Sequence, residues 1–184
     1  MHIVHLIVGL GNPGEKYRLT RHNAGFLAIN QFREQFIKEG SDFSEWKFNK
    51  KFNAEISKGE IENRKIILAK PQTFMNNSGV AVQSLINFYK IKIENILIIH
   101  DDIDLPIETS KIQKNKSSAG HKGVQSIIDG LNSKNFTRLR IGINPKIKNG
   151  ISKLKIPTEK FALEKFKKEE LEIIKQALKQ IKII

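Results

Sequence analysis

Cysteine is absent from this 184-residue chain, and so are the patterns that direct a protein into or across a membrane. Without cysteine there is no disulfide, no thiolate nucleophile and no cysteine-bound zinc, which suits a reducing cytosol. No segment reaches the roughly 18 to 20 successive apolar residues that span a bilayer. The amino-terminal residues lack the basic stretch, apolar run and cleavage site of a secretion signal. We therefore expect a cytoplasmic protein that does not bind a membrane.

Acidic residues are scarce in one part of the chain. The formal net charge is +13, yet residues 1–110 hold nearly equal numbers of basic and acidic side chains. Between residues 111 and 155 the one acidic residue is Asp129, against these basic residues: Lys111, Lys114, Lys116, Lys122, Lys134, Arg138, Arg140, Lys146, Lys148, Lys153 and Lys155. A stretch of one sign attracts polyanions, although a merely solvated lysine-rich surface remains an alternative. A membrane surface fits less well, because no strongly amphipathic basic helix lies there.

Hydrophobic patterning predicts several strands. Continuous apolar runs are typical of strands buried on both faces, and they occur within residues 1–9, 66–69 and 96–99. Residues 139–143 alternate apolar with polar or small side chains, which indicates a strand with one buried face. Residues 41–65 are polar enough for a hairpin and loops, so the sheet is expected to be mixed.

Between these segments, apolar residues recur at helical spacing. The spacing predicts helices that start near Asn23, near Asn77 or Ser78, before Val124, and at Glu169. Residues 144–158 show no periodicity and are expected to form a loop. Strands that alternate with helices indicate an α/β fold. We expect a single three-layer domain over residues 1–184, in which helices flank a mixed, mostly parallel, twisted central sheet.

Polar residues follow three of the expected strands. Ligands of an open α/β sheet bind beyond the carboxyl ends of its strands. The polar residues at those places are Asn12, the segment 73–76, and the group His100, Asp101, Asp102 and Asp104, with His22 just before the first helix. A histidine beside a carboxylate and two amides contains the parts of a hydrolase that uses a general base. Each residue alone is more typical of a cap, a turn or a strand end, so the hypothesis rests on their joint placement.

Two other kinds of site are alternatives to this one. Residues 9–14 satisfy G-x-G-x-x-G after a strand, as a dinucleotide site would. That site needs a helix that opens in the glycine turn, whereas Pro13 removes one N–H donor and the helical pattern starts only near Asn23. A metal centre at residues 100–104 would need further ligands from other strands, and the sequence offers amides and His22 there. We expect neither a cofactor nor a metal.

The chain resembles the bacterial-type peptidyl-tRNA hydrolases in four ordered blocks. These blocks are LIVGLGNPG at 6–14 with Tyr17 and TRHNAG at 20–25, KPQTFMNNSG at 70–79, HDDIDLP at 100–106, and FTRLRIGI at 136–143. The similarity extends over about residues 1–170. It implies hydrolysis of the ester bond between a peptide and the 3′ end of tRNA, which releases tRNA for reuse in translation and ribosome rescue. It also implies a monomer that acts on the acceptor and T arms.

The resemblance implies a role for each matching residue. His22 would be the base that activates water, Asp101 would orient it, and Asn76 would place the water and the ester carbonyl. Asn12 would contact the first amide of the peptide. The remaining matches would bind substrate or tRNA: Tyr17 and Phe74 near the terminal nucleotide, and Arg140, with Lys111 or Lys114, on the tRNA phosphates.

Two positions depart from the family pattern. Lys122, in SSAGHKG at 117–123, replaces an amide that contacts substrate in the family, and a phosphate contact is one alternative. Gln113 occupies the position of the lysine that pairs with the arginine at Arg140. The alternative function is that of a non-catalytic RNA-binding relative, a path that organellar splicing factors resembling the family have taken.

Overall fold

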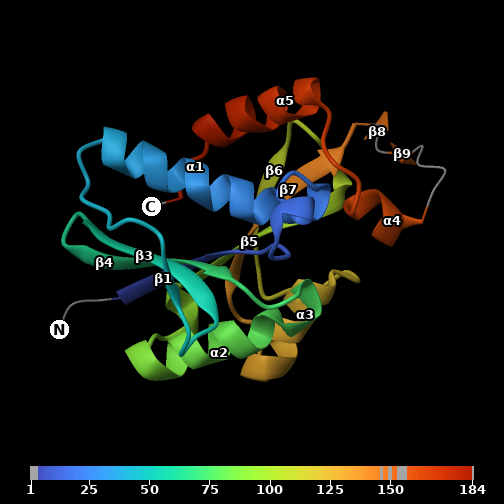
Figure 1. Ribbon diagram of the computed structural model, residues 1–184. Coiled ribbons are helices and arrows are strands. Elements are labelled where there is room, and N and C mark those ends of the chain that lie inside the picture. Colours follow the sequence, from blue (N-terminus) through green and yellow to red (C-terminus); the bar gives the residue numbers. More distant parts are fainter. Residues whose placement is uncertain (1–3, 146, 149–150, 153–156, 184) are drawn as a thin grey trace.

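A seven-stranded sheet lies between two layers of helices (Figure 1). The computed structural model describes residues 4–145, 147–148, 151–152 and 157–183. The strands are β1 (Val4–Gly9), β2 (Lys47–Asn49), β3 (Ala54–Ile61), β4 (Arg64–Pro71), β5 (Ile96–Pro106), β6 (Ser110–Lys114) and β7 (Thr137–Asn144), in the order β2-β3-β4-β1-β5-β7-β6. Strands β4, β1, β5 and β7 are parallel neighbours, whereas β2–β3, β3–β4 and β6–β7 pair antiparallel. The expected mixed, mostly parallel sheet is confirmed.

Four longer helices cover the two faces of the sheet. They are α1 (Ala24–Lys38), α2 (Ser78–Tyr89), α3 (Lys122–Leu131) and α5 (Lys168–Lys179), and a short helix, α4 (Thr158–Ala162), precedes α5. Helices α1 and α5 lie on one face, and α2 and α3 on the other (Figure 1). Helices α1, α2 and α5 begin within one residue of their predicted starts, and the predicted apolar stripe from Val124 lies within α3. No helix in the described ranges is long and apolar enough to cross a bilayer.

Strand alternation divides the core into two clusters. In β5, Ile98 packs with the residues under α2 and α3, and Ile99 packs with those under α1 and α5. Buried residues at helical spacing, such as Ile29 and Phe32 of α1, fill the side of α1 and α5. Val124 and Ile127 of α3 fill the side of α2 and α3. Both sheet faces are therefore dry, which explains the continuous apolar runs of the central strands.

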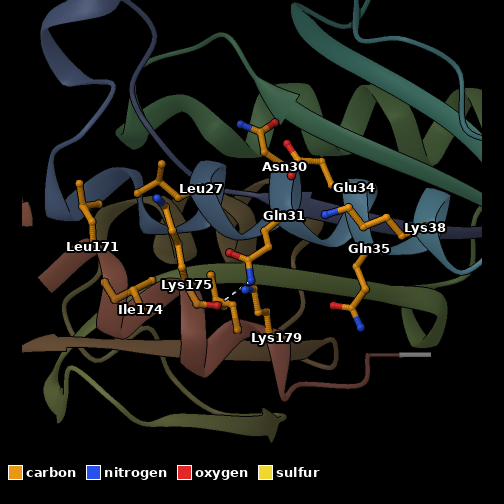
Figure 2. A pocket seen from close by; sticks show the side chains of 11 residues that line it. Leu27, Asn30, Gln31, Glu34, Gln35, Lys38, Leu171, Ile174, Lys175 and Lys179 are labelled. Atoms are coloured by element: carbon orange, nitrogen blue, oxygen red, sulfur yellow. Dashed lines mark hydrogen bonds between the residues drawn. The ribbon is translucent and has the colours of Figure 1, made fainter. Parts of the chain in front are cut away.

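Helix α5 is fastened to α1 and to the segment before α1. Figure 2 shows Gln31 of α1 reaching across a hollow, where its Nε2 donates to the backbone oxygen of Lys175 at 2.7 Å. The Arg21 guanidinium, just before α1, lies 2.9 Å from the Glu170 carboxylate, and both residues are buried. The Arg21 guanidinium also stacks over the rings of Phe161 and Phe166. These contacts hold the segment that carries His22 against the carboxy-terminal part of the chain.

Three segments differ from the expectation. Strand β5 continues through the residues that were expected to follow it, because it pairs with β7 up to Pro106. Strand β6 was not predicted, because its polar side chains at one sheet edge give no hydrophobic period. Residues 146, 149–150 and 153–156 of the range 144–158, which was expected to be a loop, lie outside the described residues, and the described part includes the paired strands β8 (Ile147–Lys148) and β9 (Ile151–Ser152).

Glu170→Ala is expected to lower the free energy of unfolding by about 3 kcal/mol, because it leaves the buried Arg21 charge without its partner. Urea unfolding measures this change. The matched control is Glu169→Ala, an exposed neighbour in the same first turn of α5, which should cost about 0.5 kcal/mol through the helix dipole. Equal losses in the two variants would show that the ion pair with Arg21 does not stabilise the fold.

Candidate active site

The site forms where β1 ends and β5 continues. Gly9, the last residue of β1, pairs with Ile99 of β5, so Asp101 lies beyond the end of its neighbour on that side. On the other side Asp101 still pairs with Ile141 of β7. The Asp101 residue is 5% exposed, and its side chain can be reached from both helix layers.

Two glycines let the start of α1 approach this point. A Cβ on Gly25 would lie 2.4 Å from the Ile99 oxygen, and one on Gly9 would lie 2.3 Å from the Gly25 oxygen. Any side chain at either position would push α1 away from β1 and β5. The glycine-rich turn thus serves helix packing, and no helix opens within it as a dinucleotide site requires.

Asp101 accepts hydrogen bonds from two imidazoles. His22 Nδ1 lies 2.9 Å from Asp101 Oδ1 and 3.0 Å from Oδ2. His121 Nε2 approaches Oδ1 from the other helix layer, also at 2.9 Å. A third histidine, His100, is fully buried, and its Nδ1 lies 2.7 Å from the backbone oxygen of Asp101. Residues that are 79 positions apart, His22 and Asp101, are thus directly bonded.

The electrostatics of this group keep Asp101 ionised and raise the pKa of His22. Burial alone would raise the pKa of Asp101, but His22 and His121 hold that pKa well below its ordinary value. Burial would lower the pKa of His22, yet the charge and hydrogen bond of Asp101 raise it above 6.5. Because a carboxylate only accepts, neutral His22 carries its proton on Nδ1 and keeps the Nε2 lone pair free to take another proton.

Two asparagines connect the loops around the site. Asn12 Oδ1 accepts the backbone N–H of Met75 at 2.8 Å, which ties the loop after β1 to the turn that carries Asn76. Asn23 exchanges two hydrogen bonds with the Asn12 backbone, at 2.8 and 3.0 Å. Since the Asn12 oxygen is engaged, its side-chain NH₂ is the group left to meet a ligand. Asn76 itself is exposed to solvent.

An open pocket of about 570 Å³ contains these residues. Its wall includes His22, Asp101, Asn12 and Asn76, and also the predicted residues Tyr17, Phe74 and Lys122. The rings of Tyr17 and Phe74 meet edge to face with centroids 6.5 Å apart, and Phe74 is 56% exposed. Across the mouth, Lys122 Nζ of α3 lies 2.9 Å from a Glu159 carboxylate oxygen of α4.

The distances at Asp101 are those of ordinary hydrogen bonds. His22, Asp101 and His121 offer ligand atoms within 4.8 Å of one another, as a metal site would. Tetrahedral zinc ligands with bonds of about 2.0 Å stand about 3.3 Å apart. The two imidazole nitrogens each lie 2.9 Å from Asp101 Oδ1, which is a hydrogen-bond distance. An ion at this position would require the side chains to move apart.

A protein-family sequence model described as peptidyl-tRNA hydrolase matches residues 6–184 of the chain. The chain belongs to the peptidyl-tRNA hydrolase family. It is 46% identical over 176 residues to the peptidyl-tRNA hydrolase of Mycoplasma mycoides. The aligned residues make up 94% of this chain and 86% of that relative. The enzyme of Bdellovibrio bacteriovorus is 45% identical over 169 residues, 90% of this chain and 82% of the relative. A crystal structure of peptidyl-tRNA hydrolase from Acinetobacter baumannii superposes with a TM-score of 0.81 and 33% identity, over 97% of this chain and 86% of that one.

In this peptidyl-tRNA hydrolase family member, the residues expected to bind tRNA phosphates lie on the strands beside the pocket. Arg140 of β7 bonds to Asp102 of β5 through its Nε and to Gln113 Oε1 of β6 at 2.7 Å. Lys111 is paired directly with Arg140 in the register, so the two side chains share a face of the sheet. Lys114 pairs with Thr137 and lies on the opposite face.

The predicted residues therefore form two groups. The four proposed catalytic residues, with Tyr17, Phe74 and Lys122, line one pocket, whereas Arg140, Lys111 and Lys114 lie outside the set of residues that line it. Sequence reasoning missed His121 and Asn23, although both stand next to residues that it singled out. It also missed Arg21, whose partner Glu170 is far away in the chain.

The His22 imidazole is expected to titrate above 6.5, as measured by its ring NMR signals across pH. In Asp101→Asn the His22 pKa should fall below 6.5, because burial is then opposed only weakly. His5 is the internal reference, since burial and Arg64 lower its pKa. A His22 pKa that is unchanged in Asp101→Asn would contradict the charge coupling between the two residues.

Proposed function

We propose that this chain hydrolyses the ester between a peptide and the 3′ end of tRNA, with His22 as the general base. The observation that carries the proposal is the bond from His22 Nδ1 to the buried Asp101 carboxylate inside an open pocket. Family membership supports the reaction class. The preserved pair of base and carboxylate favours an enzyme over a non-catalytic RNA-binding relative.

The reaction needs one water and one imidazole. His22 Nε2 takes a proton from water while the water oxygen attacks the ester carbonyl carbon, and the Asp101 carboxylate stabilises the imidazolium. When the tetrahedral intermediate collapses, the C–O bond to the ribose breaks and the ribose oxygen receives the proton from His22. The products are free tRNA and a peptide carboxylic acid, which loses its proton to solvent and becomes the carboxylate. An ester is an activated substrate, so this proposal includes neither metal nor cofactor.

The two amides would orient the substrate. Asn76 lies exposed in the pocket wall, where it could hold the water and the ester carbonyl. Asn12 has its oxygen bound to the Met75 N–H, so it would donate to a carbonyl oxygen of the peptide instead of accepting from the peptide N–H. This contact refines the role implied by the family resemblance. Tyr17 and Phe74 offer an aromatic corner for the terminal base.

The basic residues would hold the acceptor and T arms of the tRNA. Arg140 and Lys111 share one sheet face, which makes Lys111 the better substitute for the family lysine that Gln113 replaces. Such residues contact phosphates and read the shape of the helix, not its bases. Lys122 could reach a phosphate near the 3′ end once it releases Glu159. We further propose that the protein acts as a cytoplasmic monomer.

His22→Ala should reduce the release of N-acetylated amino acid from charged tRNA by about a hundredfold or more. The loss follows from removal of the proton acceptor, so tRNA affinity should remain near that of the unchanged chain in a filter-binding assay. Addition of a chelator to the unchanged chain should have no effect. Substantial hydrolysis by His22→Ala would exclude it as the base.

Arg140→Ala and Lys111→Ala should raise KM for charged tRNA and each lower the salt slope of tRNA binding by about one. A short N-blocked aminoacyl ester should be cleaved at the normal rate, because it lacks the tRNA body. Lys114→Ala is the matched control from the same strand and should change tRNA binding less than Lys111→Ala. If Arg140→Ala impairs both substrates equally, Arg140 supports the fold and not tRNA binding.

A further inference from the structure

His121 has both of its ring nitrogens engaged. It is the residue before α3, and its Nδ1 lies 3.2 Å from the Val124 backbone nitrogen. A backbone amide can only donate, so Nδ1 accepts, and the proton of the neutral ring is on Nε2. Nε2–H therefore donates to Asp101 Oδ1 at 2.9 Å. The capping bond thus selects the tautomer that can hold the carboxylate.

Packing fixes the place of the His121 ring. Its centroid is 5.0 Å from that of His22 and 4.6 Å from that of His100. The first turn of α3 packs closely against the turn that contains Met75, where a Cβ on Gly123 would come within 2.4 Å of Met75 Sδ. Burial and then His121 lower the pKa of His100, which is therefore neutral and adds no charge to the group.

We propose that His121 is a positioning residue for ester hydrolysis, because its Nε2–H holds the Asp101 carboxylate in the orientation that accepts His22 Nδ1–H. The proposal rests on the proposed function of His22 as the base. A carboxylate turns easily about its last torsion when one donor holds it. A second donor, from the opposite helix layer, removes that freedom. His121 acts through Asp101 and does not touch the reacting atoms.

The same hydrogen bond also limits the charge that His22 experiences. The groups that face His22 are Asp101, His121, Lys122 and Glu159. The hydrogen bond that His121 donates stabilises the ionised form of Asp101 and partly offsets its negative charge. Without that donor, the carboxylate would attract the His22 proton more strongly, so the pKa of His22 would rise further. A merely structural role for His121 predicts no such rise.

Two substitutions of His121 distinguish the contribution of its Nδ1 from that of its Nε2. His121→Asn keeps an oxygen near the Nδ1 position and is a favoured N-cap, but it is too short to reach Asp101. His121→Gln keeps an N–H near the Nε2 position and loses the cap. We expect His121→Asn to lower kcat about tenfold or more with KM unchanged, to raise the His22 pKa by about half a unit, and to unfold at the normal temperature. We expect His121→Gln to keep kcat within about threefold, to leave the His22 pKa unchanged and to unfold earlier.

The measurements are kcat and KM on N-acetyl-aminoacyl-tRNA, NMR titration of the His22 ring, and thermal unfolding. His5→Ala, at the opposite end of the sheet, is the control and should change neither kcat nor the His22 titration. Equal kcat values in the Asn and Gln variants, or a His22 pKa in His121→Asn that is unchanged or lower, would overturn the proposal. His22→Ala tested in parallel separates the two ideas. If His22→Ala remains active, His22 is not the base. If His22→Ala is inactive and His121→Asn keeps full activity, only the proposed role of His121 is wrong.

Discussion

The buried carboxylate of Asp101 is the constraint on which the site depends. A buried charge without partners is strongly unfavourable, and here hydrogen bonds from two imidazoles compensate for it. One imidazole comes from the segment before α1 and the other from the residue before α3. The two helix layers therefore meet at one side chain. A displacement of either layer would leave the carboxylate short of a donor and His22 without orientation.

The surrounding structure keeps those two helix ends in place. The contact between Gly9 and Gly25 brings the start of α1 onto the sheet. Gly123 lets the start of α3 pack closely against the Met75 side chain. On the outer side, the buried ion pair of Arg21 and Glu170 fastens the residue next to His22 to α5. These contacts are dry and close-packed, so they leave the arrangement of His22, Asp101 and His121 little room to vary.

Strand β5 also connects the pocket with the basic face. Successive residues of a strand point to opposite faces, so Asp101 and Asp102 serve different neighbours. Asp101 bonds to His22, and Asp102 bonds to Arg140. The proposed cleavage site and the proposed phosphate contact are therefore set by adjacent residues of one strand.

The sequence by itself determined the α/β class, the central strands and the starts of the main helices, because hydrophobic periodicity depends on near neighbours. Strand-end placement and the resemblance to a family also predicted that His22 and Asp101 lie together, and the two side chains are hydrogen-bonded. Strand β6 and the bonds of His121, Asn23 and Arg21 were decided only by the tertiary structure. Each of those features depends on a partner that is brought close by sheet register or helix packing, such as Glu170 for Arg21 and Asp101 for His121. Local patterning carries no information about such a partner, since the hydrogen bond exists only after distant segments have packed.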